Sequence, residues 1–227
     1  MTRALLALVA VLALALAGCG GGDKSSTDAN DARSSATEPQ EDTTAGACSP
    51  VEAPQPHKPG KQKKPAPLGP DESYTLTFKT NCGDFSVKLD PKQSPNATAS
   101  LVSLARADYF DDTIFHRIVP GFVIQGGDPT ATGTGGPGYT TIDRPPQGAR
   151  YTSVVVAMAK AGNEPPGAAG SQFYVVTGQD AGLPPDYAIV GNVSDGLDVV
   201  QKIGQLGDAS EQPTEAVVIE DVEVAGK

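Results

Sequence analysis

One short stretch restricts the fold of this chain more than any other. Residues 115–128 read FHRIVPGFVIQGGD. Apolar and β-branched residues lie on both sides of Pro120-Gly121, and such residues favour strands. Pro presets φ and Gly tolerates positive φ, so this pair suits the two central positions of a type II turn. The stretch therefore predicts two strands joined by a tight turn.

Three polar side chains interrupt this apolar stretch, namely His116, Arg117 and Gln125. Arg and Gln are costly to bury in a sheet unless they are paired. For any one of them, a place on a solvated face is the simplest interpretation. The order of all these residues, however, closely resembles the signature of the cyclophilins, the cyclosporin-binding family of peptidyl-prolyl cis-trans isomerases.

Composition narrows the classes of function. A chain of 227 residues holds one domain with extensions or two small domains. Its 26 Gly and 20 Pro residues indicate many turns and some disordered sequence. The formal net charge of −10 argues against nucleic-acid binding, which needs a basic surface. Three Cys without metal-ligand spacing and only two His argue against a zinc site, and we expect no metal and no cofactor.

The N-terminus has the pattern of an export signal. Arg3 precedes an apolar run over residues 4–17, which is short for a transmembrane helix and typical of a signal peptide. The run ends in Leu-Ala-Gly-Cys19, which resembles the lipobox of bacterial lipoproteins; the alternative is an ordinary signal peptide with an incidental cysteine. This resemblance implies that residues 1–18 are removed and that lipidated Cys19 anchors the exported chain to the outer face of the cell membrane.

Residues 19–70 predict a disordered tether. They are poor in apolar residues and rich in Gly, Ser, Thr, Asp and Pro, so they bury too little surface to offset chain entropy. Residues 50–70 are Pro-rich and should be stiffer, partly as polyproline II. Residues 57–64 carry four lysines and no acidic residue. This run is either solvated linker or a contact for anionic phospholipid or cell-wall polymer.

The cysteines outside the lipobox predict one disulfide. With Cys19 lipidated, Cys48 and Cys82 remain in an oxidising compartment. Cys82 lies at the tip of a predicted hairpin, and Cys48 lies on a tether that can reach it. A Cys48–Cys82 bond would fold the Pro-rich segment back onto the domain.

Residues 71–227 have the pattern of a globular, mainly β domain. Alternating polar and apolar residues over 74–78 and 85–89 predict a hairpin. Ser94-Pro95 predicts the start of a helix that continues to about Ala107, and a second helix is expected near residues 197–203. Further strands are predicted over residues 151–159, 171–176, 187–193 and 216–224. Many strands, two helices and frequent turns indicate a closed β-barrel capped by two α-helices.

The resemblance to the cyclophilins extends over residues 73–224. Residues 158–162, MAKAG, are similar to the family's M-A-N-A-G, residues 170–174, GSQFY, to G-S-Q-F-F, and residues 187–191, YAIVG, to H-x-V-F-G. The family fold is a closed eight-stranded β-barrel with two capping helices, so the resemblance implies that fold here.

The same resemblance implies a site for proline isomerisation. The barrier to prolyl amide rotation, about 18–20 kcal/mol, comes from amide resonance, so the enzyme needs no covalent chemistry. It needs an apolar pocket for the ring and a fixed cation that favours the twisted amide, and the family's catalytic arginine corresponds to Arg117. For His116, two roles are compatible with the sequence: a structural hydrogen bond or a contact with the ligand. The implied ring pocket is Phe122, Val123, Tyr174 and Leu183, with peptide contacts from Gln125, Gln172, Ala159, Lys160 and Tyr187.

Several positions depart from the family pattern. Lys160 replaces the family's Asn, Tyr174 replaces Phe, Val123 replaces a frequent Met and Tyr187 replaces His. The family's cyclosporin-contacting Trp corresponds to Gly182, so we expect weak cyclosporin binding because a large aromatic contact and its indole donor are missing. The segment between 161 and 172 is longer than usual and should reshape one rim of the pocket.

Three functions are compatible with these features. The first is a peptidyl-prolyl cis-trans isomerase, monomeric and membrane-tethered, whose clients are Pro-containing exported polypeptides. The second is a cyclophilin-fold binding module for Pro-containing segments with little catalysis. The third is a solute-binding lipoprotein, which the small size of the domain disfavours because such proteins usually have two lobes.

Overall fold

The computed structural model describes residues 48–227, so the expected signal peptide and Cys19 lie outside the described residues. Ser94 precedes the first helix as predicted, but its hydroxyl donates to the Ile189 carbonyl at 2.6 Å and makes no cap hydrogen bond. None of the helices within residues 48–227 has the length and apolarity needed to cross a membrane. The elements, in chain order, are β1 Tyr74–Thr80, β2 Gly83–Leu89, α1 Pro95–Ala105, β3 Thr113–Ile114, β4 Arg117–Val119, β5 Val123–Gly126, β6 Thr141–Ile142, β7 Val155–Met158, β8 Ala168–Ala169, β9 Phe173–Val176, β10 Ile189–Asp195, α2 Leu197–Ile203 and β11 Val218–Gly226.

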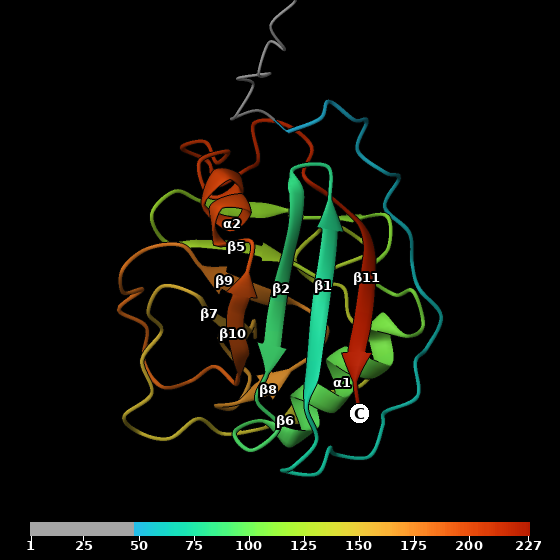
Figure 1. The fold of residues 1–227 in the computed structure, drawn as a ribbon, viewed down its shortest axis with the longest axis vertical. Coiled ribbons are helices and arrows are strands. Elements are labelled where there is room, and N and C mark those ends of the chain that lie inside the picture. Colours follow the sequence, from blue (N-terminus) through green and yellow to red (C-terminus); the bar gives the residue numbers. More distant parts are fainter. Residues whose placement is uncertain (1–47) are drawn as a thin grey trace, which may run out of the picture. The chain divides into compact units, whose positions relative to one another are not determined.

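The described strands form one large curled sheet and one small sheet. The large sheet has nine strands in the order β3-β11-β1-β2-β10-β7-β9-β5-β4, and β6 pairs with β8 in the small sheet. Figure 1 shows α2 at one end of the curled sheet and α1 toward the other. The mainly β fold with two helices is therefore confirmed.

The strand count differs from the expected eight for a local reason. The two edge strands, β3 and β4, are separated only by Phe115 and His116, which interrupt the ladder. Counted as one stretch of chain, they restore eight strands. The two edges of the sheet are thus joined through these two residues, and the sheet must curl to bring them together.

The β4–β5 hairpin forms as its sequence predicts. Gly121 has a φ of 71°, and the Phe122 amide donates to the Val119 carbonyl at 3.0 Å, which closes the turn. The register pairs Ile118 with Ile124. Both side chains are fully buried, so one face of the hairpin belongs to the core.

Aromatic side chains fill the interior of the curled sheet. Phe78 stacks on Phe85 with ring centroids 4.9 Å apart, and Phe173 lies 5.1 Å from Phe78. Phe110 and Phe115 meet the ring of Phe173 edge-on. Offset and edge-to-face contacts of this kind add to the stability gained from burying the rings.

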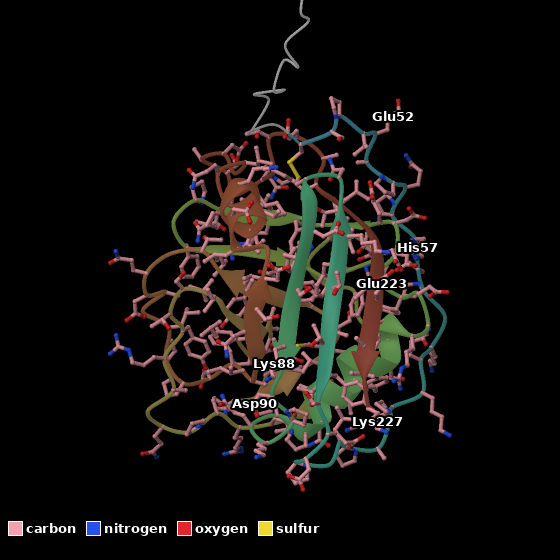
Figure 2. The ribbon with its side chains drawn as sticks, in the orientation of Figure 1. Glu52, His57, Lys88, Asp90, Glu223 and Lys227 are labelled. Atoms are coloured by element: carbon pink, nitrogen blue, oxygen red, sulfur yellow. A yellow bond between two sulfur atoms is a disulfide. The ribbon has the colours of Figure 1, made fainter. Side chains whose placement is uncertain are left out.

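Residues 48–70, here called the strap, lie against the domain instead of forming the expected disordered tether. The strap has no helix or strand and runs along the outside of the domain to β1 (Figure 1). Its backbone donates from His57 to the Pro129 carbonyl at 2.9 Å and from Gln62 to the Pro137 carbonyl at 3.0 Å, and Leu68 packs on the core. Figure 2 labels Glu52 and His57 on this segment, both exposed. Low apolar content predicts disorder, but a prediction from composition cannot include these hydrogen bonds, which hold the strap on the domain.

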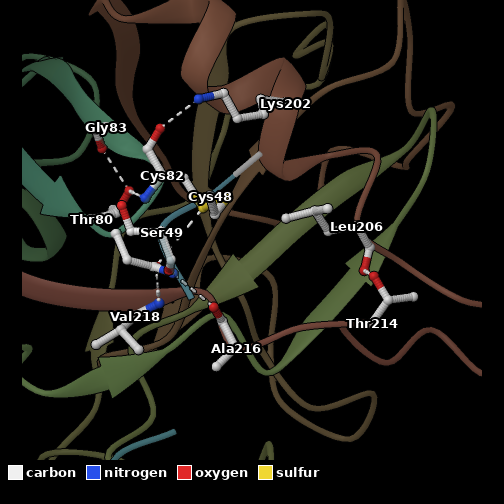
Figure 3. Close-up of a disulfide and its surroundings, with 11 residues drawn as sticks. Cys48, Ser49, Thr80, Cys82, Gly83, Lys202, Leu206, Thr214, Ala216 and Val218 are labelled. Atoms are coloured by element: carbon white, nitrogen blue, oxygen red, sulfur yellow. Dashed lines mark hydrogen bonds between the residues drawn. A yellow bond between two sulfur atoms is a disulfide. The ribbon is translucent and has the colours of Figure 1, made fainter. Parts of the chain in front are cut away.

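The strap begins at the predicted disulfide between Cys48 and Cys82, which the structure contains (Figure 3). Asn81 completes this junction. Its side-chain amide donates to the carbonyls of Ser49 and Ala216 at 2.9 and 3.0 Å, and its carbonyl group accepts from the Val218 amide at 2.8 Å. The junction ties the strap to the β1–β2 turn and to the start of β11.

Candidate active site

The site lies on the face of the sheet that turns away from the aromatic core. Side chains alternate along a strand, so the neighbours of the buried Ile118 and Ile124 point to the opposite face. The register places Gln125 between Arg117 on β4 and Tyr174 on β9. A second apolar cluster, separate from the main core, covers this face and consists of Val123, Tyr151, Val155, Ala157, Tyr174 and Val176.

A pocket of about 280 Å³ opens on this face. Its walls combine apolar side chains with the guanidinium of Arg117 and the amide of Gln125. Gln172 lines a smaller adjoining pocket of about 110 Å³, which shares Gln125, Ala159 and Lys160 with the first. The structure thus brings together the implied site residues, and the main pocket is lined by Arg117, Phe122, Val123, Gln125, Ala159, Lys160, Tyr174, Leu183 and Tyr187.

Arg117 is held on three sides. Its Nε donates to Glu211 Oε2 at 2.7 Å, and its Nη1 lies 3.5 Å from Gln125 Oε1. Its Cζ lies 5.9 Å from the centroid of the Phe122 ring. The side chain is 31% exposed, so the guanidinium remains accessible to a bound peptide.

The two glutamines form a chain of hydrogen bonds that begins at Arg117. Gln125 Nε2 donates to Gln172 Oε1 at 3.0 Å, and Gln172 Nε2 donates to the Gly135 carbonyl at 3.0 Å. Each amide therefore has a defined orientation. This chain fixes the polar wall of the pocket before a ligand enters.

Close backbone contacts support the apolar wall. The amides of Thr177 and Gly178 both donate to the Phe122 carbonyl, at 2.9 and 3.3 Å. A Cβ at Gly178 would lie 2.1 Å from the Gly121 carbonyl oxygen, so only glycine fits there. This contact holds the β4–β5 turn, and hence Phe122, against the strand end of β9.

Comparisons with known proteins settle the family. Residues 75–224 match the family model described as cyclophilin type peptidyl-prolyl cis-trans isomerase/CLD. The chain belongs to this family. It is 37% identical over 175 residues to peptidyl-prolyl cis-trans isomerase A of Mycobacterium tuberculosis, covering 69% of this chain and 94% of that protein. It is also 37% identical over 173 residues to peptidyl-prolyl cis-trans isomerase B of Streptomyces anulatus, covering 67% and 97%.

A solved cyclophilin supports the same assignment through the fold. The crystal structure of a cyclophilin type peptidyl-prolyl cis-trans isomerase from Cryptosporidium parvum superimposes with a TM-score of 0.63 at 31% identity. The match covers 68% of this chain and 99% of that one. The cyclophilin fold therefore accounts for the domain. The strap, residues 48–70, lies outside the matched family region of residues 75–224.

A cluster of three tyrosines forms part of the cyclophilin pocket in this chain. The rings of Tyr151, Tyr174 and Tyr187 lie with centroids 5.7 to 6.4 Å apart. The Tyr151 hydroxyl donates to the Tyr187 carbonyl at 2.8 Å, whereas the buried Tyr174 hydroxyl has no hydrogen-bond partner among residues 48–227. Burial raises the pKa of Tyr174, and the neighbouring tyrosines Tyr151 and Tyr187 add to the rise. Tyr174 thus enters the pocket as a neutral phenol.

Lys160, which replaces the usual cyclophilin Asn, is anchored rather than free. Only 5% of its side chain is exposed. Its Nζ donates to the Glu164 carbonyl at 3.2 Å, lies 3.6 Å from Asp186 Oδ2 and sits 5.5 Å from the centroid of the Tyr187 ring. Lys160 therefore connects the long loop after residue 161 to the segment that carries Tyr187.

His116 lines neither of the two pockets described above. It is 8% exposed, and neither ring nitrogen has a hydrogen-bond partner among residues 48–227. The structural hydrogen bond that sequence reasoning left open for His116 is therefore absent among residues 48–227, and a ligand role for His116 stays a prediction. Burial lowers the pKa of His116; the carboxylate of Asp128 opposes this shift and Arg117 adds to it.

Asp128, the last residue of the stretch 115–128, has a structural role. Burial alone would raise its pKa, but hydrogen bonds from Thr130 and Gly135 outweigh burial and hold the pKa below its usual value. Its carboxylate accepts from the Thr130 amide at 2.8 Å, the Thr132 amide at 3.2 Å and the Gly135 amide at 3.0 Å. The loop that receives Gln172 is built on this carboxylate.

Sequence reasoning missed two partners of the site. Glu211 pairs with Arg117 across 94 positions of sequence, and Tyr151 supports Tyr187 through two hydrogen bonds. Tyr151 stood inside a predicted strand, where a core role was the natural interpretation. Glu211 lies in a stretch without a motif, so no local signal pointed to it.

Proposed function

We propose that this chain is a cyclophilin-type peptidyl-prolyl cis-trans isomerase that acts on Pro-containing segments of exported proteins. It is tethered to the outer face of the membrane by a lipid on Cys19. The observation that carries the catalytic part is the position of the Arg117 guanidinium at the edge of an apolar pocket. This is the pair of features that proline isomerisation requires.

The mechanism follows from the loss of amide resonance during rotation. In this proposal the prolyl ring binds against the apolar wall of the pocket that Arg117 also lines, formed by Phe122, Val123, Tyr174 and Leu183. Twisting removes double-bond character from the C–N bond, and the lone pair that was shared with the carbonyl becomes localised on the nitrogen. A donor from Arg117 is stronger toward that twisted state than toward either planar state, so it lowers the barrier. No bond to the peptide is made or broken.

Preorganisation is the second contribution of the site. Arg117, Gln125 and Gln172 already have their hydrogen-bond partners before a peptide binds. The enzyme therefore spends little free energy on reorganising these groups during the reaction. In this proposal the two glutamines orient the peptide backbone, and Ala159 and Lys160 form the opposite side of the groove.

Three features support export and anchoring. The apolar run over residues 4–17 and the Leu-Ala-Gly-Cys19 sequence have the pattern of a lipoprotein signal. The Cys48–Cys82 disulfide suits an oxidising compartment. Several acyl chains on one residue would give a stable anchor, since one chain alone binds only marginally.

A protease-coupled assay on a short X-Pro peptide tests the catalytic part. Arg117→Ala should lose about 10²–10³ in kcat/KM, the usual cost of removing one preorganised donor. Arg117→Lys keeps the charge without the planar fork and should recover only part of the loss. Arg144→Ala is the matched control, because Arg144 is exposed and does not line the pocket. Turnover near wild type from a folded Arg117→Ala protein would refute the mechanism.

Fractionation of cells tests the anchor separately. Cys19→Ala should move the protein from the membrane fraction to the soluble exported fraction. Retention of Cys19→Ala in the membrane fraction would contradict a lipid anchor at this residue without touching the catalytic proposal.

A binding module with little catalysis is the second candidate, and the altered rim favours it. Lys160 and Tyr187 replace family residues and are fixed to one another by a cation–π contact. A rim held in place by this contact would release bound Pro-containing segments slowly. If the wild-type protein binds a Pro-containing peptide without isomerising it, the binding module is the correct function.

A further inference from the structure

Glu211 contacts the guanidinium of Arg117 directly. The motifs that carry the resemblance to the cyclophilins do not include Glu211. Its Oε2 accepts from Arg117 Nε at 2.7 Å, within the range of charge-assisted hydrogen bonds. The Glu211 side chain is 50% exposed and that of Arg117 is 31% exposed. An ion pair at this exposure adds little to the stability of the fold. Its effect should therefore be sought in the geometry of Arg117.

The loop that carries Glu211 is tightly constrained. The Asp208 carboxylate accepts from the amides of Ser210 and Gln212 at 2.7 and 3.0 Å, and the Asp208 amide donates to the Gln212 carbonyl at 2.9 Å. Glu211 itself has a φ of 64°, a left-handed conformation that is unfavourable for glutamate. The fold thus keeps a side chain with poor backbone fit at the tip of an ordered loop.

The loop is also docked onto the strand that bears Arg117. The Ile118 amide donates to the Glu211 carbonyl at 3.1 Å, so the backbone of Glu211 is bonded to the residue next to Arg117. A Cβ at Gly207 would lie 2.2 Å from the Ile118 carbonyl oxygen, which allows only glycine at this contact. Backbone and side chain of Glu211 therefore reach β4 at two successive residues.

These contacts divide the guanidinium into two functional parts. Nε is taken by Glu211, and Nη1 faces Gln125 at 3.5 Å. With Nε bonded to Glu211, the two Nη groups are the donors that remain for a peptide in the pocket, which Arg117 lines. We propose that Glu211 is a positioning residue that sets the orientation of the Arg117 guanidinium for catalysis. This inference rests on the catalytic role proposed for Arg117.

A competing effect predicts the opposite change in turnover when the Glu211 carboxylate is removed. A carboxylate beside Arg117 also offsets part of its positive charge, which would weaken its attraction for the twisted amide. If positioning dominates, removing the carboxylate lowers turnover. If charge offset dominates, the same change raises turnover, and that result would overturn the proposal.

The experiment measures kcat and KM for Glu211→Ala, Glu211→Gln and the control Glu215→Ala in the purified protein. Glu215 is exposed on the same segment and is not a pocket residue. Glu211→Ala should lower kcat about tenfold, since misplacement of a catalytic group by 1 Å costs up to about 10²-fold. KM should change little because the apolar wall is intact, and Glu211→Gln should restore part of kcat because its oxygen still accepts a hydrogen bond. Glu215→Ala should behave as wild type.

A double-mutant comparison separates this inference from the proposed function. In the Arg117→Ala background, Glu211→Ala should have no further effect on kcat/KM, because its partner is gone. An equal fold-loss in both backgrounds would overturn the proposal that Glu211 acts through Arg117. If Arg117→Ala itself keeps full turnover, the catalytic role proposed for Arg117 fails instead.

An NMR measurement gives a readout that does not depend on activity. The Arg117 Nε–H resonance should exchange slowly with water in the wild-type protein because it is bonded to Glu211. It should exchange fast in Glu211→Ala while the thermal midpoint stays unchanged. Identical exchange in both proteins would show that Glu211 does not hold the guanidinium in solution.

Discussion

The disulfide that closes the strap gives a prediction whose size follows from the structure. Cys48 and Cys82 are 34 residues apart in sequence. Cross-linking a loop of this length removes enough entropy from the unfolded chain to stabilise the fold by about 3.8 kcal/mol in the chain-entropy model. The double variant Cys48→Ser, Cys82→Ser should therefore be less stable than the wild type by up to this amount.

The structure also says why the measured loss should stay below that limit. Without the bond, the strap is held by hydrogen bonds such as those of Ser49 to Asn81 and His57 to Pro129. Each is worth about 1 kcal/mol net, so part of the strap will detach and regain entropy in the folded state. Detachment lowers the free energy of the folded variant and offsets part of the lost constraint.

Urea unfolding and thermal melts of both proteins measure the effect. A loss of 2–4 kcal/mol would lower the midpoint temperature by roughly 4–16 °C for a chain of this size. Trypsin should cut the variant faster at the exposed Lys61 and Lys63 of the strap, whereas Lys58 and Lys64 precede proline and are not trypsin sites. Isomerase turnover should be unchanged, because no strap residue lines the pocket. Equal midpoints together with equal trypsin sensitivity would refute the view that this bond holds the strap.

Three further predictions concern the site. Tyr174→Phe should keep turnover and match or exceed wild-type stability in melts, since it removes a buried hydroxyl without a partner, a group that costs about 1–3 kcal/mol. Burial holds the pKa of His116 below its usual value near 6.5, so lowering the pH below that value should destabilise the folded protein, because the unfolded chain binds the proton more readily. Between pH 7.5 and 5.5 the thermal midpoint should therefore fall more for wild type than for His116→Gln. Cyclosporin should bind weakly, so submicromolar inhibition would contradict the expectation; Gly182→Trp should tighten binding, although its φ of 62° makes the substitution strained.

The residues of the main pocket could be named from the sequence because short motifs carry the resemblance to the cyclophilins, and the structure places these motifs on neighbouring strands. Arg117 and Gln125 lie in one hairpin and are paired in register. Tyr174 follows in the next strand and pairs with Gln125. Once these patterns are placed in adjacent strands, the period of two decides which side chains share a face.

The partners of the pocket were not predictable because they depend on approaches between distant segments. Glu211 reaches Arg117 only through the loop that docks on Ile118, and its left-handed backbone leaves no pattern in the sequence. The resemblance implied a peptide contact from Lys160, but nothing in the sequence indicated that its side chain is buried against Asp186 and Tyr187. The strap has the composition of a disordered linker, and its order comes from a disulfide and from backbone bonds that composition does not report.

The hairpin β4–β5 explains how one short sequence serves both the core and the site. Ile118 and Ile124 enter the core, while Arg117 and Gln125 point to the pocket. A slip of one residue would reverse both faces, placing the guanidinium in the core and isoleucine in the pocket. The Pro120-Gly121 turn prevents that slip because the bond from the Phe122 amide to the Val119 carbonyl sets the register. The fold of this turn therefore decides which side chains face the site, whereas the orientation that we propose for Arg117 depends in addition on the distant loop of Glu211.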